Sequence, residues 1–379
     1  GNTMNKKDIM ELKRRFKKEA CTFTRMCGCY VSVEKEKITK IAETFLNLED
    51  EEFYKYLEIA KKTLSGNIGN NLVELAFPRE QEAAGGKQQF LMGLRESKLK
   101  NDDLLDTFYD MIIDNYDRVG NYLILIFHDA YDVMTKTSDN DKLDESEEVY
   151  EYLLCAICPV ELTKPALGYR EAENRIGARI RDWVVGMPET GFVFPAFTDR
   201  STDIHSVMFY TKNTVNPHVE FEDGVLGCME HMTSDQKKVE FAQIVKDVVG
   251  DDDDEETIQI YNEVQDTLNE VLQNEQEKAE ESSTNEPDEP PKVVLTEQII
   301  NEVLEKVNLF EDQKEAIKKS CADVIPEDTE VAEIIDEKAI KAAEQTRYLN
   351  KLKELLLAAA EVLEKTGETE LVKEIRDAV

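Results

Sequence analysis

The order of hydrophobic and polar residues divides the chain into a mixed N-terminal part and a helical C-terminal part. Short apolar or alternating runs, typical of β-strands, occupy the first part. These runs lie at 22–33, 72–77, 121–128, 150–160, 182–187, 191–197 and 204–211. Apolar residues spaced three and four apart indicate helices at 6–19, 48–64 and 102–116.

The links between the strands predict how the strands pair. After residue 182 the links are short and polar, which suits antiparallel hairpins better than helical crossovers. The run at 121–128 is apolar without interruption from Tyr122 to Phe127, which indicates burial on both faces of a sheet. We therefore predict an α+β domain at 4–250, with a mainly antiparallel sheet flanked by helices.

After Pro217 the pattern becomes helical. An acidic amphipathic helix is expected at 251–279, and the composition of 280–292 is typical of a disordered acidic linker. The all-helical C-terminal segment, 293–379, follows the linker. Further helices are expected at 234–249, 296–307, 312–322, 329–365 and 370–379. Because Gly367 separates the last two helices, they are expected to form a hairpin that serves docking or oligomerisation.

Charge is concentrated in one stretch of this acidic protein. The net charge is −35 at pH 7, and residues 220–291 hold four basic and 23 acidic residues, a net charge of −19. Such a field repels nucleic-acid phosphate and anionic membranes, and it favours solvation or a basic partner. The basic face of the first helix is expected to be solvated or to pair with the acidic stretch, since no aromatic residues accompany it as in nucleic-acid sites.

The sequence also bears on the cellular compartment. No apolar run approaches the roughly 20 residues that a membrane-spanning helix needs, and no secretory leader pattern is present. An odd count of seven cysteines favours reduced thiols over a disulfide framework. We therefore expect a cytoplasmic protein, and we interpret residues 1–3, before Met4, as a cloning remnant.

Four cysteines are candidate metal ligands. Cys155 and Cys158 form a C-x-x-C pair, and Cys27 and Cys29 lie near the N-terminus. Thiolates at such spacings suit tetrahedral zinc sites. The pair lies inside an expected strand, however, where positions three apart point to opposite faces. The preferred interpretation is therefore buried structural thiols, with no metal and no other cofactor.

Two titratable clusters are candidates for acid–base or metal chemistry. One follows the most buried strand, and the other lies in the loop before the strand at 204–211. If the clusters met in the fold, they could exchange protons with a substrate or hold a metal. Otherwise the acidic residues are turn residues and the second histidine is a strand residue. The candidates are His128, Asp129, Asp199, Arg200, Asp203 and His205.

Familiar catalytic motifs are absent from the sequence. It contains no phosphate-binding loop, dinucleotide-binding glycine motif, nucleophile elbow, zinc-protease motif or calcium loop. We therefore predict a non-enzymatic binding or regulatory protein that contacts a protein partner, or a second copy of itself, through the helical tail. The alternative is a hydrolase or metal-dependent enzyme with a site near His128, Asp199 and His205.

Several long segments occur in an order that matches a known family. They are NKKDIMELKRRF (5–16), TRMCGCYV (24–31), KKTLSGNIGNNL (61–72), NYLILIFHDAYDV (121–133), YEYLLCAICPVELTKPALGY (150–169) and RDWVVGMPETGFVFPAFTDRSTDIHSVMFYTKN (181–213). Together they resemble the bacterial family called domain of unknown function 4317, over about residues 4–250. The tail beyond about Asp328 departs from that resemblance. The resemblance implies a bacterial, cytoplasmic protein and assigns no activity or catalytic residue.

Overall fold

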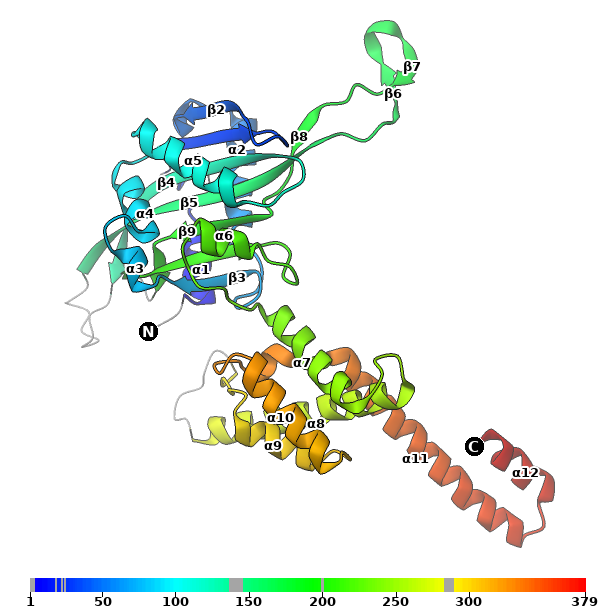
Figure 1. The fold of residues 1–379 in the computed structure, drawn as a ribbon. Helices are drawn as coiled ribbons and strands as arrows, with labels where there is room; N and C mark the ends of the chain where they lie inside the picture. Colours follow the sequence, from blue (N-terminus) through cyan, green and yellow to red (C-terminus); the bar gives the residue numbers. More distant parts are fainter. Residues whose placement is uncertain are drawn as a thin grey trace. The chain divides into compact units, whose positions relative to one another are not determined.

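The computed structural model describes residues 4–135, 146–198, 201–282 and 290–379, except 18, 22 and 24. The chain forms two compact units, Gly1–Thr233 and Ser234–Val379 (Figure 1). The first unit contains the sheet and the second is helical, as the hydrophobic pattern predicts. The boundary lies before the expected domain end at residue 250, because helix α7 (Ser234–Val249) contributes its apolar face to the core of the second unit.

The first unit is built on an eight-stranded antiparallel sheet. Seven strands follow the order β2-β1-β4-β5-β9-β12-β3, and β8 pairs with β5 beside them. The pairs β6–β7 and β10–β11 form separate two-stranded ribbons. The strands are β1 (Arg25–Val31), β2 (Lys37–Glu43), β3 (Leu72–Ala76), β4 (Asn121–Thr135), β5 (Ser146–Leu162), β6 (Leu167–Arg170), β7 (Arg175–Ala178), β8 (Trp183–Val185), β9 (Thr190–Phe194), β10 (Ala196–Thr198), β11 (Ser201–Asp203) and β12 (Ser206–Thr211).

The hairpin of β4 and β5 forms the middle of the sheet, and the two strands pair along the whole length of β4. Side chains on β4 alternate between two cores: Ile124 and Ile126 lie in one, and Leu125 and Phe127 lie in the other. The prediction that this run is buried on both faces is confirmed. Both strands extend beyond their expected ends, so His128, expected at the end of its strand, lies inside β4.

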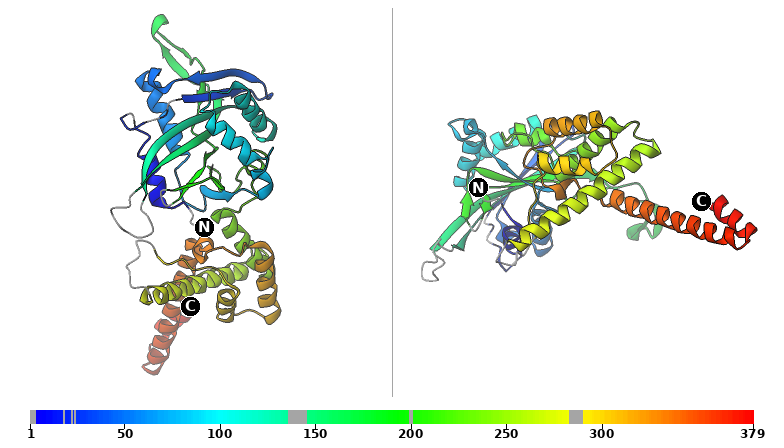
Figure 2. Two further views of the ribbon diagram at one scale, coloured as in Figure 1. Left: turned by 90° about the vertical axis from the view of Figure 1, so that its left-hand side faces the viewer. Right: turned by 90° about the horizontal axis from the view of Figure 1, so that it is seen from below.

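Helices cover both faces of the sheet (Figures 1 and 2). α4, α5 and α6 pack on the face that contains Ile126, and α1 and α2 pack on the face that contains Phe127. α1 ends before its expected end at residue 19, because the chain turns and places Phe16 in the core. The helices are α1 (Lys6–Lys13), α2 (Asp50–Lys62), α3 (Arg79–Glu82), α4 (Lys87–Glu96), α5 (Asp102–Asn115) and α6 (Val219–Gly224), with short 3-10 turns η1 (Phe45–Asn47) and η3 (Glu171–Glu173).

The second unit is a helical bundle around a single apolar core. The acidic helix expected at 251–279 buries one face there and leaves its carboxylates on the other, which is how so acidic a segment folds. A buried ion pair adds to this core: Lys237 Nζ lies 3.1 Å from Glu333 Oε1. The helices are α7, α8 (Glu255–Glu281), α9 (Glu297–Glu305), α10 (Glu311–Val324), the 3-10 turn η4 (Val331–Ile334), α11 (Glu337–Lys365) and α12 (Thr369–Ala378).

The helix expected at 329–365 differs at its start. η4 comes first, and α11 begins only at Glu337, where the side chain of Asp336 accepts a hydrogen bond from the Ala339 N–H and caps the helix. Most of the expected linker, 280–292, lies outside the described residues. Among the described helices, none is both long enough and apolar enough to cross a membrane.

Each unit has one segment that projects from its compact body. Residues 163–187 leave the sheet of the first unit after β5, form the projecting β6–β7 ribbon and return through β8, which pairs with β5. We call them the finger (Figure 1). Residues 344–379, the distal part of α11 together with α12, leave the helical core of the second unit, and we call them the arm (Figure 1). α12 folds back on α11, where Ala360 and Val372 are buried, and the turn between the helices contains Gly367 at φ +84°.

Gly191 tests how tightly the centre of the sheet is packed. A Cβ atom at this position in β9 would lie 2.2 Å from the carbonyl oxygen of Cys155 on β5. Gly191→Ala should therefore lower the free energy of unfolding by about 1–3 kcal/mol, measured by chemical denaturation. Gly168→Ala in β6 is the control, because the nearest atom there lies 3.8 Å away. Equal stability of the two variants would contradict the packing described.

Candidate functional site

The side chains of the first titratable pair, His128 and Asp129, lie on opposite faces of the sheet. His128 and Asp129 are neighbours in β4, so their side chains point to opposite faces. His128 lies on the face of Ile126, and Asp129 lies on the face of Phe127. The adjacency of these two residues in the sequence therefore does not bring their functional groups together.

His128 is buried, with only 3% of its surface exposed. Its Nε2 lies 3.8 Å from Oε2 of Glu151 on β5, and neither ring nitrogen has a hydrogen-bond partner among the described residues. Arg95 on α4 donates a hydrogen bond of 3.2 Å to the backbone carbonyl of Glu151. Burial lowers the pKa of His128, and the nearby Glu151 carboxylate opposes that shift in part. The ring is therefore neutral at pH 7 and could act as a base.

Asp129 belongs to a second buried polar group. Its Oδ2 accepts a hydrogen bond of 2.6 Å from the hydroxyl of Tyr152, and Nε of Arg15 lies 3.8 Å away. The Arg15 guanidinium also stacks over the ring of Tyr131, 3.9 Å from its centroid. The arginine that follows α1 thus pairs with this carboxylate of the sheet. The arrangement fixes the N-terminal segment on the sheet.

The second titratable cluster lies at the surface. His205 is 68% exposed in its side chain, and its Nδ1 lies 2.6 Å from Oε1 of Glu82 on α3. The hydrogen bond with Glu82 is the main reason that the pKa of His205 is raised. The side chain of Asp203 accepts a hydrogen bond from the backbone N–H of His205, which is typical of a turn residue. Asp199 and Arg200 lie outside the described residues.

In the described part of the chain, the two clusters have different hydrogen-bond and ion-pair partners. His128 is coupled to Glu151 and Arg95, whereas His205 is coupled to Glu82. These contacts belong to different elements, and no hydrogen bond or ion pair between described residues links His128 or Asp129 to Asp203 or His205.

The four candidate cysteines are buried in the core of the first unit. Cys27 and Cys29 on β1 and Cys155 on β5 lie in the same core, whereas Cys158 lies in the other. The prediction that Cys155 and Cys158 point to opposite faces is thereby confirmed. Burial raises the pKa of all four thiols, so they remain protonated at pH 7. Among the described residues, no group of three or more metal-ligating side chains has the geometry to hold a metal ion.

A polar network at the other end of the sheet was missed by the sequence reasoning. The hydroxyl of Tyr116 lies 3.3 Å from Oε2 of Glu189, and Arg118 is ion-paired with the same carboxylate at 2.8 Å. The ring of His218 packs 5.0 Å from the ring of Tyr116, and its Nδ1 lies 2.9 Å from Glu220 Oε1. The residues come from distant loops, so spacing along the sequence carried no signal of their meeting. Every charge described here is paired, which is typical of a structural network.

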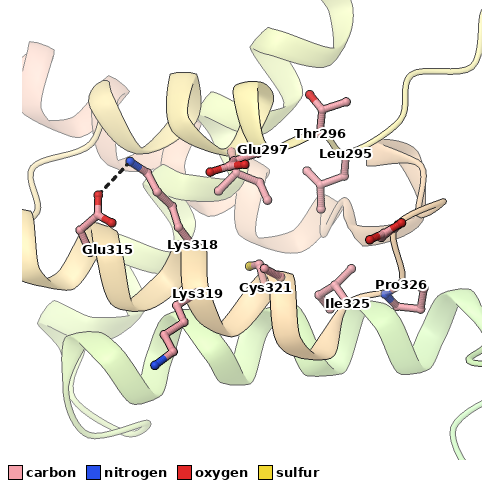
Figure 3. Close-up of a pocket in the computed structure, with 12 residues that line it drawn as sticks. Leu295, Thr296, Glu297, Glu315, Lys318, Lys319, Cys321, Ile325 and Pro326 are labelled. Carbon is pink, nitrogen blue, oxygen red and sulfur yellow. Dashed lines mark hydrogen bonds and ion pairs between the residues drawn. The ribbon is translucent and has the colours of Figure 1, made fainter.

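A cavity lies between α9 and α10, with a volume of about 480 Å³ (Figure 3). Leu295, Cys321 and Ile325 line its apolar part, and Lys318 at its rim is bonded to Glu315 at 3.3 Å. Burial raises the pKa of Cys321 to about 12, so this thiol is not a nucleophile at pH 7. The cavity thus offers apolar contact and no activated reactive group.

The finger presents an unusual surface for so acidic a protein. Residues 163–187 include five basic and three acidic residues, and none of them is buried. The single tryptophan, Trp183, is 57% exposed. Exposed apolar and aromatic side chains accompany it: Leu167, Tyr169, Ile176, Ile180, Val184 and Val185. Trp, Tyr and Arg are the residues most enriched at the centres of protein interfaces.

The arm exposes a second apolar surface. Every side chain from Glu344 to Ala359 is exposed, and six of these are large and apolar. The six are Tyr348, Leu349, Leu352, Leu355, Leu356 and Leu357. The sequence predicted the hairpin, but the absence of any packing on this part of α11 became visible only in the fold.

The chain belongs to the family described as Domain of unknown function (DUF4317), whose model matches residues 4–377. The expected family is confirmed. The match also continues through the arm, so the expectation that the tail beyond Asp328 departs from the family is wrong. No curated protein matches the chain. The family description assigns no activity, and the function must be inferred from the molecule itself.

His128 should make the stability of the protein depend on pH below neutrality. Because burial lowers its folded-state pKa below the unfolded value of about 6.5, the unfolded chain binds the proton more readily. The stability contribution is present above about pH 6.5 and is lost as the pH falls through the folded pKa. His128→Gln should flatten the decline of the unfolding free energy between about pH 7 and 5. Unchanged slopes in denaturation at several pH values would contradict this assignment.

Glu222 on α6 should have the opposite dependence. Burial raises its pKa to about 7, although the backbone N–H of His231 donates a hydrogen bond to its Oε2. The stability present below the unfolded pKa of about 4.5 is therefore lost as the pH rises through 7. Glu222→Gln keeps an acceptor for His231 and should stabilise the protein by up to about 3 kcal/mol near pH 8. If this gain in unfolding free energy did not shrink as the pH fell toward about 4.5, ionisation of Glu222 would not be its cause.

Proposed function

We propose that this is a non-enzymatic binding or regulatory protein that acts through protein–protein contacts, with the arm as its main contact surface. The observation that carries this proposal is the exposed apolar stretch of α11 from Glu344 to Ala359. A patch of this kind on a single chain is typical of an interaction site.

The energetics support contact with a partner. Burying one leucine side chain is worth about 1.5–3 kcal/mol, and on one face of the arm Leu349, Leu352, Leu355 and Leu356 are each at least 39% exposed. Leucine has a high helix propensity, but helix formation alone does not require leucine at these positions. Alanine, lysine and glutamate would serve as well for the helix alone. The leucines are therefore best explained by contacts that they make outside this unit.

The finger supports the same class of function. It combines Trp183 with exposed aliphatic residues and with the cations of Arg170, Arg175 and Arg179. A partner with acidic groups around an apolar surface would complement it. Nucleic acid is a less suitable partner, because the net charge of −35 repels phosphate at longer range. We propose no membrane contact and no cofactor.

The enzyme alternative has one observation in its favour. His128 is a buried, neutral imidazole beside a carboxylate, and such perturbed groups cluster at catalytic sites. Its ring lies in a packed core between β4, β5 and α4, however, and its contacts do not include His205. A hydrolase or metal-dependent site at His128, Asp199 and His205 would need a surface opening beside His128. Binding through the arm requires no such change.

Two adjacent leucines provide a matched test of the proposed function. Leu356 is 42% exposed and Leu357 is 43% exposed, but they lie on different faces of α11. In affinity capture from cell extract, Leu352→Glu/Leu356→Glu should reduce the proteins retained at least about tenfold, since each leucine is worth more than 1.4 kcal/mol. Leu357→Glu should retain them.

Circular dichroism and thermal unfolding of each variant confirm that the fold is intact. A captured set that is unchanged in the double variant would rule out the arm as the contact surface. Loss of capture in Leu357→Glu alone would place the contact on another face of α11.

A further inference from the structure

The apolar residues of the arm form a continuous stripe. They repeat at the g, a and d positions of successive heptads, a spacing that places them on one face of a helix and suits packing against another helix. The stripe consists of Tyr348, Leu349, Leu352, Leu355, Leu356, Ala359 and Val362. α12 covers a neighbouring face, where Ala360 and Val372 are buried, and leaves Val362 63% exposed. The stripe is thus free from Tyr348 to Val362.

Charge is segregated along the same helix. Residues 338–353 hold five basic residues and one acidic residue, whereas residues 354–379 hold seven acidic and three basic residues. We call residues 338–353 the root; they include the six residues of α11 just before the arm and have a net charge of +4. Residues 354–379 are the tip and have a net charge of −4. Arg347 at the root is paired with Asp266 of α8, and Lys341 is exposed. An arm with a basic root and an acidic tip is complementary to an antiparallel copy of itself.

The root also contains a hollow. A space of about 430 Å³ is lined by Lys341, Glu344, Gln345, Tyr348 and Leu349. Two of these residues, Tyr348 and Leu349, begin the apolar stripe, so the hollow is continuous with it. A side chain presented by a partner's tip would fill this space next to the basic residues of the root.

From these features we infer that the arm pairs with the arm of a second copy of this chain, antiparallel and about a two-fold axis near Leu355. This inference rests on the proposed function, because it names the occupant of the arm's apolar stripe. The axis places Leu355 against its own copy and Tyr348 against Val362 of the partner subunit. Leu352 then packs between Leu356 and Ala359 of the partner subunit. Each α12 then flanks the pair, and the two hairpins form a four-helix bundle.

A second copy fits better than an unrelated helix. The root and the tip have net charges of equal size and opposite sign. A two-fold axis places each basic root beside the acidic tip of the other copy. A parallel pair would place the two basic roots side by side and the two acidic tips side by side. The charges thus select the antiparallel orientation, and the stripe supplies the buried surface.

The first experiment measures association of the full chain. Analytical ultracentrifugation over a range of protein concentrations should show a dimer that dissociates on dilution and weakens with added salt. Leu352→Glu/Leu356→Glu should sediment as a monomer, whereas Leu357→Glu should remain dimeric. A wild-type chain that stays monomeric at the highest concentration, or a double variant that remains dimeric, would overturn the inference.

The second experiment tests orientation by disulfide cross-linking. Chains with Tyr348→Cys mixed with chains with Val362→Cys should form a mixed disulfide, because the two positions meet only in the antiparallel pair. In that pair the two copies of residue 348 are separated by about 20 Å along the axis, at 1.5 Å per residue, which is too far for a disulfide. Self-cross-linking of Tyr348→Cys would indicate a parallel pair and overturn the inference.

The controls separate this inference from the proposed function. The wild-type chain measures background, because six native cysteines are buried and Cys21 is half-buried. A monomeric wild type that still captures proteins through Leu352 and Leu356 would overturn self-pairing and leave the proposed function intact. A monomeric wild type whose capture of proteins does not depend on Leu352 and Leu356 would contradict both the inference and the proposed function.

Discussion

The β4–β5 hairpin is the constraint on which the first unit depends. Its strands pair along the whole length of β4, and both faces of the hairpin are covered by helices. Any polar group on it must therefore be neutral or paired, since a buried unpaired charge is very costly. His128 meets this condition by staying neutral, and Asp129 meets it through Tyr152 and Arg15. His128 and Asp129, which the sequence suggests as catalytic candidates, thus both meet the packing requirement of the hairpin.

The same constraint explains the thiols. A strand that is buried on both faces needs small apolar side chains where helices and neighbouring strands approach closely, and a protonated cysteine serves as one. Cys155 and Cys158 lie on opposite faces of β5, each in a different core. Next to Cys155, the backbone approaches β9 so closely that only glycine fits at position 191. Packing alone therefore accounts for Cys155 and Cys158, the two cysteines that the C-x-x-C pattern suggests as metal ligands.

The sequence predicted the features that depend on local periodicity. The uninterrupted run from Tyr122 to Phe127 and the three–four spacing of α8 both report burial directly, and both match the fold. Edge elements left weaker signals: β2 buries no side chain, so its pattern does not alternate with burial. The network of Tyr116, Glu189 and His218 depends on contacts between distant loops. No spacing rule contains that information, because the fold alone determines which loops meet.

The basic and the exposed apolar groups of this protein, whose net charge is −35, are unevenly distributed. Most of the acidic groups are solvated on faces such as that of α8, whose opposite face is buried. The finger and the root of the arm are different, because both combine a local excess of basic residues with exposed large apolar side chains. The surrounding negative field repels acidic macromolecules from most of the surface, and these two elements are places where an acidic partner is attracted. For the arm, the chain itself carries a suitable acidic partner in its own tip. Self-association through the arm would leave the finger as the surface available to a different protein.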